Sequence, residues 1–198
     1  MSKEYEILEE TPAYRGFFNL TRYRLRHTLY GGGWTQPITR ELFHRGQCVA
    51  VLPYDPVTDR LVLIEQFRIG AVGTQQPPWL IETVAGAVEA GETAEEVARR
   101  ESLEEAGCEL GQLIRIGEFF TSPGGTSEKV TLFCGIVAGD LQEGLFGLHE
   151  EHEDIRAIVL GFDEAWAWLS SGVIDSVVPA LALQWLMLNK GRFLAARE

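Results

Sequence analysis

Acidic side chains in residues 92–107 have the types and spacing that most clearly suggest chemistry. Glu101 and Glu105 are four residues apart, which places both carboxylates on one face of a helix, with Glu104 beside them. Like charges at this spacing repel, and the cost rises where the face is partly buried. A hard cation such as Mg²⁺ or Mn²⁺ would offset the repulsion, because clustered carboxylate oxygens suit it. The pattern indicates a divalent-metal site; the alternative is a solvated acidic face.

The sequence around these carboxylates predicts the helix that positions them. Thr93 is a candidate N-cap, and Glu96 three residues later would complete a capping box. Gly107 is a stop signal at the other end. An apolar stripe at helical spacing precedes the carboxylates and consists of Ala94, Val97 and Ala98. One face of this helix therefore begins apolar and ends acidic.

A metal on Glu101 and Glu105 would suit hydrolysis of a phosphate ester or anhydride, because a cation neutralises phosphate oxygens and activates water. Glu104 is a further ligand or a supporting group. Arg100 is expected to pair with these carboxylates and fix their rotamers, or to form an ordinary surface ion pair. Gly86 would let the backbone approach the site closely.

The acidic loop His149–Asp154 is the best source of a general base. It is the densest run of ionisable residues in the chain. Read alone, the loop is more typical of a solvated surface segment. The spacing of His149 and His152 also suggests zinc, but no further residues complete such a site.

Composition limits the classes of function. The 198 residues favour one domain with an appendage, and 45% hydrophobic residues suffice for a core. A net charge of −12 argues against a non-specific nucleic-acid binder, and it requires cations to bring in an anionic substrate. The sequence has no apolar run that could span a membrane and no signal-peptide pattern, so a cytoplasmic protein is expected. Its cysteines are expected to be reduced and buried; they are Cys48, Cys108 and Cys134.

Hydrophobic patterns along the chain predict mixed strands and helices. Residues 18–43 read as a β-hairpin around Gly31–Gly33, preceded by a loose segment or an edge strand. Asp163 is expected to cap a helix that runs through Leu169, and residues 139–154 are expected to form a long acidic loop. A last amphipathic helix, 176–189, would carry Leu181, Trp185 and Leu188. Further strands are expected at 48–53, 61–68, 113–121, 130–137 and 155–160. This order indicates an α+β fold or an α/β/α sandwich.

The spacing of glycines and carboxylates in residues 86–107 resembles the Nudix box. The matching positions are Gly86, Glu92, Arg100, Glu101, Glu104, Glu105 and Gly107. Ser102 and Cys108 depart from it, since a bulky aliphatic residue is usual at both, but both are packing positions.

Signatures outside the box resemble the ADP-ribose pyrophosphatase branch of the Nudix hydrolases. Pro123, fifteen residues after Cys108, has a spacing similar to the one that marks this branch. The matching stretches are Tyr14–Phe18, Arg40–Glu41, Glu65–Arg68, Ser122–Glu128 and Glu151–Ile155.

The resemblance implies a Mg²⁺-dependent hydrolase (Mn²⁺ as an alternative) with two or three ions per site. Glu101, Glu105, Glu153 and the carbonyl of Ala85 would hold the metal, and Glu151 would deprotonate the attacking water. Arg68 and Arg40 would contact the diphosphate or the nucleotide, while Phe17 and Phe18 would lie against the adenine from the partner subunit of a homodimer. Other substrate-lining positions would be Ala87, Ser122 and Glu128.

The implied fold is a Nudix-like α/β/α sandwich with a mixed sheet, preceded by a small N-terminal antiparallel sheet. Residues 1–45 would form a hairpin and dimerisation segment, and residues 46–198 the hydrolase domain. ADP-ribose would be hydrolysed to AMP and ribose 5-phosphate. Two alternatives remain at this point: hydrolysis of another nucleoside diphosphate sugar, such as GDP-mannose or ADP-glucose, and a non-catalytic nucleotide-sugar sensor. The complete set of box carboxylates weighs against the sensor.

Overall fold

The structure, a computed structural model, describes residues 2–74 and 76–195. The chain divides into two compact units. The first consists of Met1–Gln47 and Phe120–Lys129, and the second of Cys48–Phe119 and Val130–Glu198. Residue 1 and residues 196–198, the ends of the two predicted domains, lie outside the described residues.

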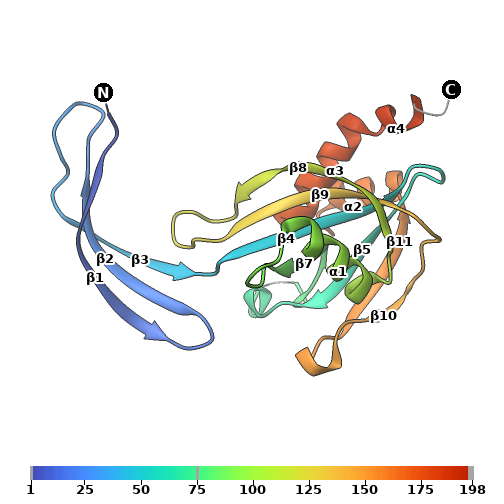
Figure 1. Cartoon of the computed structure of the whole chain (residues 1–198), viewed down its shortest axis with the longest axis horizontal. Coiled ribbons are helices and arrows are strands. Elements are labelled where there is room, and N and C mark those ends of the chain that lie inside the picture. The colour runs from blue at the N-terminus through green and yellow to red at the C-terminus, as the bar shows by residue number, and fades with distance from the viewer. Residues whose placement is uncertain (1, 75, 196–198) are drawn as a thin grey trace. The chain divides into compact units, whose positions relative to one another are not determined.

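The first unit contains the small antiparallel sheet that the sequence predicted. Its strands are β1 (Tyr5–Arg15), β2 (Asn19–His27) and β3 (Ile38–His44), in the order β1-β2-β3 (Figure 1). Strand β1 pairs with β2 from Tyr5↔His27 to Arg15↔Asn19, so the segment expected to be loose or an edge strand is a paired edge strand. The connection between β2 and β3 contains Gly32 and Gly33, both at positive φ, as a tight turn requires.

A distant loop completes the first unit. Phe43 at the end of β3 forms a parallel bridge with Thr126. The Phe43 amide donates to the Gly125 carbonyl at 2.8 Å, and the Ser127 amide donates to the Phe43 carbonyl at 3.1 Å. These bonds explain why residues 120–129 belong with the N-terminal strands, which hydrophobic patterning did not indicate.

The second unit is built on an eight-stranded sheet. Its main path runs β10-β11-β5-β4-β9-β8, with β6 paired to β5 and β7 paired to β4 (Figure 1). The strands are β4 (Gln47–Asp55), β5 (Arg60–Phe67), β6 (Trp79–Glu82), β7 (Val84–Ala87), β8 (Leu110–Phe120), β9 (Lys129–Val137), β10 (Gly144–Phe146) and β11 (Ile155–Gly161). Short 3₁₀ turns lie at η1 (Ile69–Ala71) and η2 (His149–Glu151).

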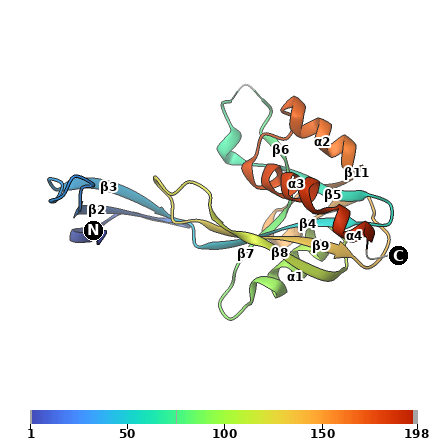
Figure 2. The same ribbon diagram turned by 90° about the horizontal axis from the view of Figure 1, so that it is seen from above.

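Helices cover both faces of this sheet. Helix α1 (Ala94–Ala106) lies on one face, and α2 (Phe162–Ser171) and α3 (Val177–Asn189) lie on the other, followed by the short α4 (Gly191–Ala195) (Figure 2). Strand β5 is buried on both sides: Val62 and Ile64 join the core beneath α1, while Leu61 and Leu63 join the core beneath α2 and α3. Its continuous apolar run follows from this double burial. The predicted α+β fold, a mixed sheet between helices, is confirmed.

Three details of the sequence-based reading differ from the structure. The acidic loop 139–154 also contains β10 and η2. Gly161, not Asp163, is the N-cap of α2, and Asp163 lies in the first turn. In α3 Leu188 is 83% exposed. Nearly every residue of α3 is apolar, so hydrophobic spacing did not determine which side is buried; its buried residues are Pro179, Ala182, Leu183 and Leu186.

The cysteines follow the sequence-based expectation more closely. All three cysteines are thiols; Cys108 and Cys134 are buried, and Cys48 is half-buried. Within residues 2–74 and 76–195, no helix has the length and hydrophobicity needed to cross a membrane.

Candidate active site

Helix α1 begins and ends at the predicted signals. The Thr93 hydroxyl accepts the Glu96 amide at 3.3 Å, and the Glu96 carboxylate accepts the Thr93 amide at 2.8 Å, which completes the capping box. These bonds hold the pKa of Glu96 below its ordinary value. Gly107 takes the left-handed conformation that ends the helix, with φ of 60°.

Strand β7 brings the backbone against the acidic face of α1. A Cβ atom at Gly86 would lie 1.7 Å from Oε1 of Glu101, so only glycine leaves room for this carboxylate. One residue earlier, the amide of Ala85 donates to Oε2 of Glu105 at 2.9 Å. Ala85, Glu101 and Glu105, three of the predicted metal-binding positions, are therefore neighbours.

Arg100 contacts three carboxylates of the box. Its guanidinium donates to Glu92 at 3.0 and 3.2 Å, to Glu101 at 2.8 Å and to Glu104 at 3.0 Å. The side chain is only 32% exposed, and its partners raise the pKa of Arg100 further. The same contact lowers the pKa of Glu92. The expected pairing of Arg100 with the acidic face is therefore present, and Glu92 is a partner that the sequence did not identify.

Burial makes Glu105 the most unusual carboxyl of the site. The residue is 2% exposed, and desolvation raises its pKa to about 8. The Ala85 amide and the charge of Arg68 oppose this rise, whereas the charges of Glu101 and Glu153 add to it. Burial also raises the pKa of Glu101, although Arg100 counteracts it. Desolvation is therefore the main cause of the raised pKa of both carboxyls.

The loop after β10 brings the remaining acidic candidates toward α1. The Gly147 amide donates to the Glu104 carbonyl at 3.1 Å, which ties the loop to the end of the helix. Oε2 of Glu153 accepts the Leu148 amide at 3.1 Å. Glu151 closes η2 and is exposed to solvent. The charge of Glu153 thus acts on Glu105 and helps to raise its pKa. No side-chain hydrogen bond or ion pair of Glu151 occurs among the described residues.

Arg68, which directly follows β5, pairs with the last residue of β6. Nε of Arg68 donates to Oε2 of Glu82 at 2.7 Å, and the Arg68 charge acts on Glu105. Glu82 was not among the predicted residues, and its place in a short strand gave no signal of a functional role. Ala87, at the end of β7, is exposed and pairs with Cys48 of β4.

The other predicted substrate positions belong to the first unit. Phe17 is 95% exposed, whereas Phe18 is half-buried with its ring centroid 5.0 Å from that of Phe43. Arg40 is exposed and donates to the Thr39 carbonyl at 2.7 Å. Ser122 is exposed at the start of its loop, and Glu128 pairs with Arg45 at 3.0 Å. The structure groups Phe18, Arg45 and Glu128 within this unit, and Arg45 was missed from the sequence.

The carboxylates of the second unit suit a hard divalent cation by their chemistry and crowding. Glu105 is buried without a full counter-charge, and the absence of a Cβ at Gly86 lets the Glu101 carboxylate lie against β7. In the described part of the chain, however, no three His, Cys, Asp or Glu side chains converge closely enough to hold an ion as they stand. Arg100 and the backbone amides of Ala85 and Leu148 occupy their oxygens instead. By their chemistry, the carboxylate oxygens are donors that a hard divalent cation accepts.

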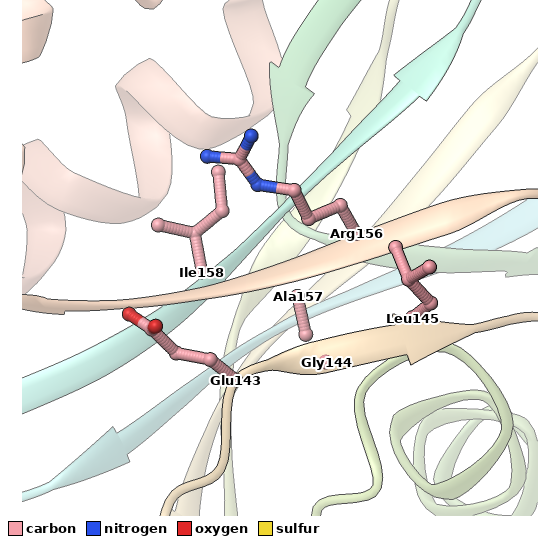
Figure 3. A pocket seen from close by; sticks show the side chains of 6 residues that line it. All are labelled: Glu143, Gly144, Leu145, Arg156, Ala157 and Ile158. Atoms are coloured by element: carbon pink, nitrogen blue, oxygen red, sulfur yellow. The ribbon is translucent and has the colours of Figure 1, made fainter.

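A separate pocket of about 310 Å³ lies beside the edge strand β10 (Figure 3). Arg156 in its wall pairs with Glu65 at 3.4 Å, and Ile158 belongs to the core beneath α2 and α3. The lining residues are Glu143, Gly144, Leu145, Arg156, Ala157 and Ile158. It contains none of the predicted site residues.

Known proteins resemble this chain along most of its length. The NUDIX domain family matches residues 44–179. The ADP-ribose pyrophosphatase of Escherichia coli (strain K12) is 45% identical over 186 residues, which cover 94% of this chain and 89% of that protein. The ADP-ribose pyrophosphatase of Haemophilus influenzae is 43% identical over 190 residues, covering 94% and 88%. A GDP-mannose pyrophosphatase of Escherichia coli O1:K1 / APEC is 33% identical over 151 residues, covering 76% and 78%.

A solved structure shares the fold. The crystal structure of an ADP compounds hydrolase superposes with a TM-score of 0.68 and covers 93% of this chain and 95% of the other, at 19% sequence identity. The family match includes the whole of α1 with its glycines and carboxylates. The chain therefore belongs to the NUDIX domain family.

Proposed function

We propose that this protein is a Nudix pyrophosphohydrolase that cleaves the diphosphate bond of ADP-ribose to give AMP and ribose 5-phosphate. One observation carries the choice of substrate. The similarity to ADP-ribose pyrophosphatases covers 94% of the chain at 45% identity, so it extends well beyond the NUDIX match at residues 44–179. The acidic face of α1 supports the reaction class, because diphosphate hydrolysis needs positive charge against the phosphate oxygens.

The proposed cofactor is Mg²⁺, with Mn²⁺ as a substitute. Glu101, Glu105, Glu153 and the Ala85 carbonyl would hold it, because these groups supply oxygen ligands on neighbouring elements. When bound, the cation neutralises phosphate oxygens and lowers the pKa of a water molecule. Arg100, which now donates to Glu101 and Glu104, would keep those carboxylates oriented.

The remaining steps fall to side chains of the chain itself. Glu151 is the proposed base, and its carboxylate would take a proton from the attacking water. Its exposure in η2 keeps it accessible, and the Gly147–Glu104 hydrogen bond ties its loop to α1. Arg68 would donate to a diphosphate oxygen, for which a planar guanidinium is suited. Its present partner Glu82 would keep the guanidinium in place.

The first unit is proposed to bind the nucleoside and ribose parts of the substrate. Phe17 is the stronger candidate for stacking on the adenine, because its ring is almost fully exposed. Phe18 would act beside it, with Arg40 on the nucleotide side. Ser122, Glu128 and Ala87 would line the ribose and phosphate side. We propose a homodimer in which residues 1–45 contribute to the partner's site.

The second candidate substrate is GDP-mannose, favoured by the relative that is 33% identical over 76% of this chain. Hydrolysis of either substrate would use the acidic helix. The two activities would differ in the pocket that binds the nucleobase. Initial rates on ADP-ribose, ADP-glucose and GDP-mannose at equal concentration, with Mg²⁺, separate them. We expect ADP-ribose to be cleaved fastest; faster cleavage of GDP-mannose would overturn the assignment.

A further inference from the structure

The loop that carries Glu151 and Glu153 closes on itself through Leu148. The Leu148 carbonyl accepts the amides of Glu151 at 2.9 Å and Glu153 at 3.2 Å, and the Leu148 amide donates to Oε2 of Glu153 at 3.1 Å. The His152 amide donates to the His149 carbonyl at 3.2 Å. The backbones of the two proposed functional residues therefore belong to one short ring of hydrogen bonds.

His152 is the residue at which this ring turns. Its φ of 57° and ψ of 34° lie in the left-handed region. The bonds from Glu153 to Leu148 and from His152 to His149 have the pattern of a Schellman motif, whose left-handed residue is usually glycine. Gly172 takes the corresponding place after α2, with φ of 80° and the same pattern of bonds. At η2 the turn is made by a residue that has a Cβ atom, and strained backbone of this kind gathers at functional sites.

The neighbours of His152 show that the position supplies a backbone conformation. Its imidazole is exposed and forms no hydrogen bond or ion pair with any residue that the structure describes. Across the ring, a Cβ atom at Gly147 would lie 2.7 Å from the Cβ of Glu153, so the chain passes Glu153 closely. The Gly147 amide donates to the Glu104 carbonyl at 3.1 Å, which joins the ring to the end of α1.

We propose that His152 is a positioning residue whose left-handed backbone places Glu151 and Glu153 relative to α1. This inference rests on the proposed function, which assigns proton transfer to Glu151 and metal binding to Glu153. The turn returns the Glu153 amide and carboxylate to Leu148 and leaves Glu151 at the exposed end of η2. The role belongs to the backbone, so another residue that adopts this conformation replaces His152.

A pair of substitutions at His152 tests this role. Asparagine tolerates the left-handed region, whereas valine, branched at Cβ, rarely enters it. We expect His152→Val to lower kcat on ADP-ribose by about 10- to 100-fold, because it displaces Glu151, and His152→Asn to keep the wild-type kcat. The Mg²⁺ concentration for half-maximal activity should rise roughly tenfold in His152→Val alone, because Glu153 moves.

A readout without substrate tests the placement of Glu153 separately. Mg²⁺ stabilises the folded protein when it binds, so it raises Tm. We expect this rise to be smaller in His152→Val than in the wild type and unchanged in His152→Asn. Gly147→Ala, which crowds Glu153 from the other side of the ring, should also reduce it. Thermal denaturation in chelator verifies that each variant folds.

His149 provides the matched control. It is an exposed histidine of the same loop, and its φ is not positive. His149→Val therefore removes the same side chain without opposing the backbone conformation. We expect it to keep the wild-type kcat and the wild-type rise of Tm with Mg²⁺.

Two results would overturn the role of His152. Equal kcat in His152→Asn and His152→Val would show that the backbone conformation is immaterial, and an equal loss in both would show that the imidazole itself is needed. Failure of the proposed function is distinguishable, because the wild-type protein would then not hydrolyse ADP-ribose. The rise of Tm with Mg²⁺ still decides in that case, and equal rises in the two variants would contradict the proposal.

Discussion

At the scale of single residues, Glu105 has the most unusual environment in the candidate site. A carboxyl that is 2% exposed, and close to the charges of Glu101 and Glu153, is costly to ionise without a compensating cation. The backbone amide of Ala85 supplies one hydrogen bond, which reduces this cost without removing it. A buried acid with this environment is typical of a functional site.

Replacing Glu105 tests its metal-binding role. Glu105→Gln preserves the volume and can still accept the Ala85 amide, but removes the charge, so we expect the fold to persist while kcat/KM falls by at least about 100-fold. Steady-state kinetics at saturating Mg²⁺ measure the effect. Glu95→Gln, at an exposed position of the same helix, is the control and should keep wild-type activity. Near-normal turnover in Glu105→Gln would count against the assignment.

The raised pKa of Glu105 also predicts how the stability of the metal-free protein depends on pH. Its pKa rises from 4.5 to about 8 in the folded state, so between these values the folded protein holds a proton that the unfolded chain has released. The contribution of this group to the free energy of unfolding therefore decreases as pH rises through that interval. In chelator, Tm should fall more between pH 5 and pH 8 in the wild type than in Glu105→Gln. Equal falls in the two proteins would show that Glu105 is not the titrating group.

At the scale of elements, the proposed metal site depends on the close contact between β7 and α1. Gly86→Ala would place a Cβ 1.7 Å from Oε1 of Glu101, and the flexible carboxylate would have to move away. We expect the fold to survive and activity to fall by roughly 10- to 100-fold, because a small displacement of a catalytic group is expensive. Gly139→Ala, whose added Cβ meets no atom within 4 Å, is the control. Equal activity in the two variants would mean that this close approach is dispensable.

Local signals explain which elements the sequence could predict. The capping box of Thr93 and Glu96, the stop at Gly107 and the strand at 61–68 are encoded within a few residues, and the structure confirms each. Glu153, which precedes β11, was connected with the box only by the resemblance to the Nudix hydrolases.

Features that depend on long-range packing were not predictable. The pairing of residues 120–129 with β3 and the contact of Arg45 with Glu128 join segments more than 80 residues apart. The Arg68–Glu82 pair depends on the register of β5 against β6. Hydrophobic periodicity carries no information about such pairings, because it reports only which face of each element is buried.

At the scale of the whole molecule, the exposed apolar side chains of the first unit support the proposed homodimer. Such side chains are costly to leave in water when they gather on a thin sheet. They include Tyr5, Ile7, Tyr14 and Phe17, which are 73%, 48%, 64% and 95% exposed. Light scattering at micromolar concentration should give twice the chain mass of 22.1 kDa.

A charged substitution tests whether this surface forms the dimer. Ile7→Glu is expected to shift the population toward monomer, because it would place charge in an apolar interface. Val57→Glu, at a position 70% exposed in the second unit, should leave the mass unchanged. A wild-type protein that is monomeric at micromolar concentration would remove the proposal that Phe17 and Phe18 act in a partner's site.

The most direct test of the account is an ADP-ribose hydrolysis assay with chromatographic identification of the products, run with Mg²⁺ and with chelator. The acidic face of α1 and the similarity across 94% of the chain predict AMP and ribose 5-phosphate in equal amounts, and no product once the cation is removed. Intact ADP-ribose in the presence of Mg²⁺, or undiminished turnover in chelator, would contradict it.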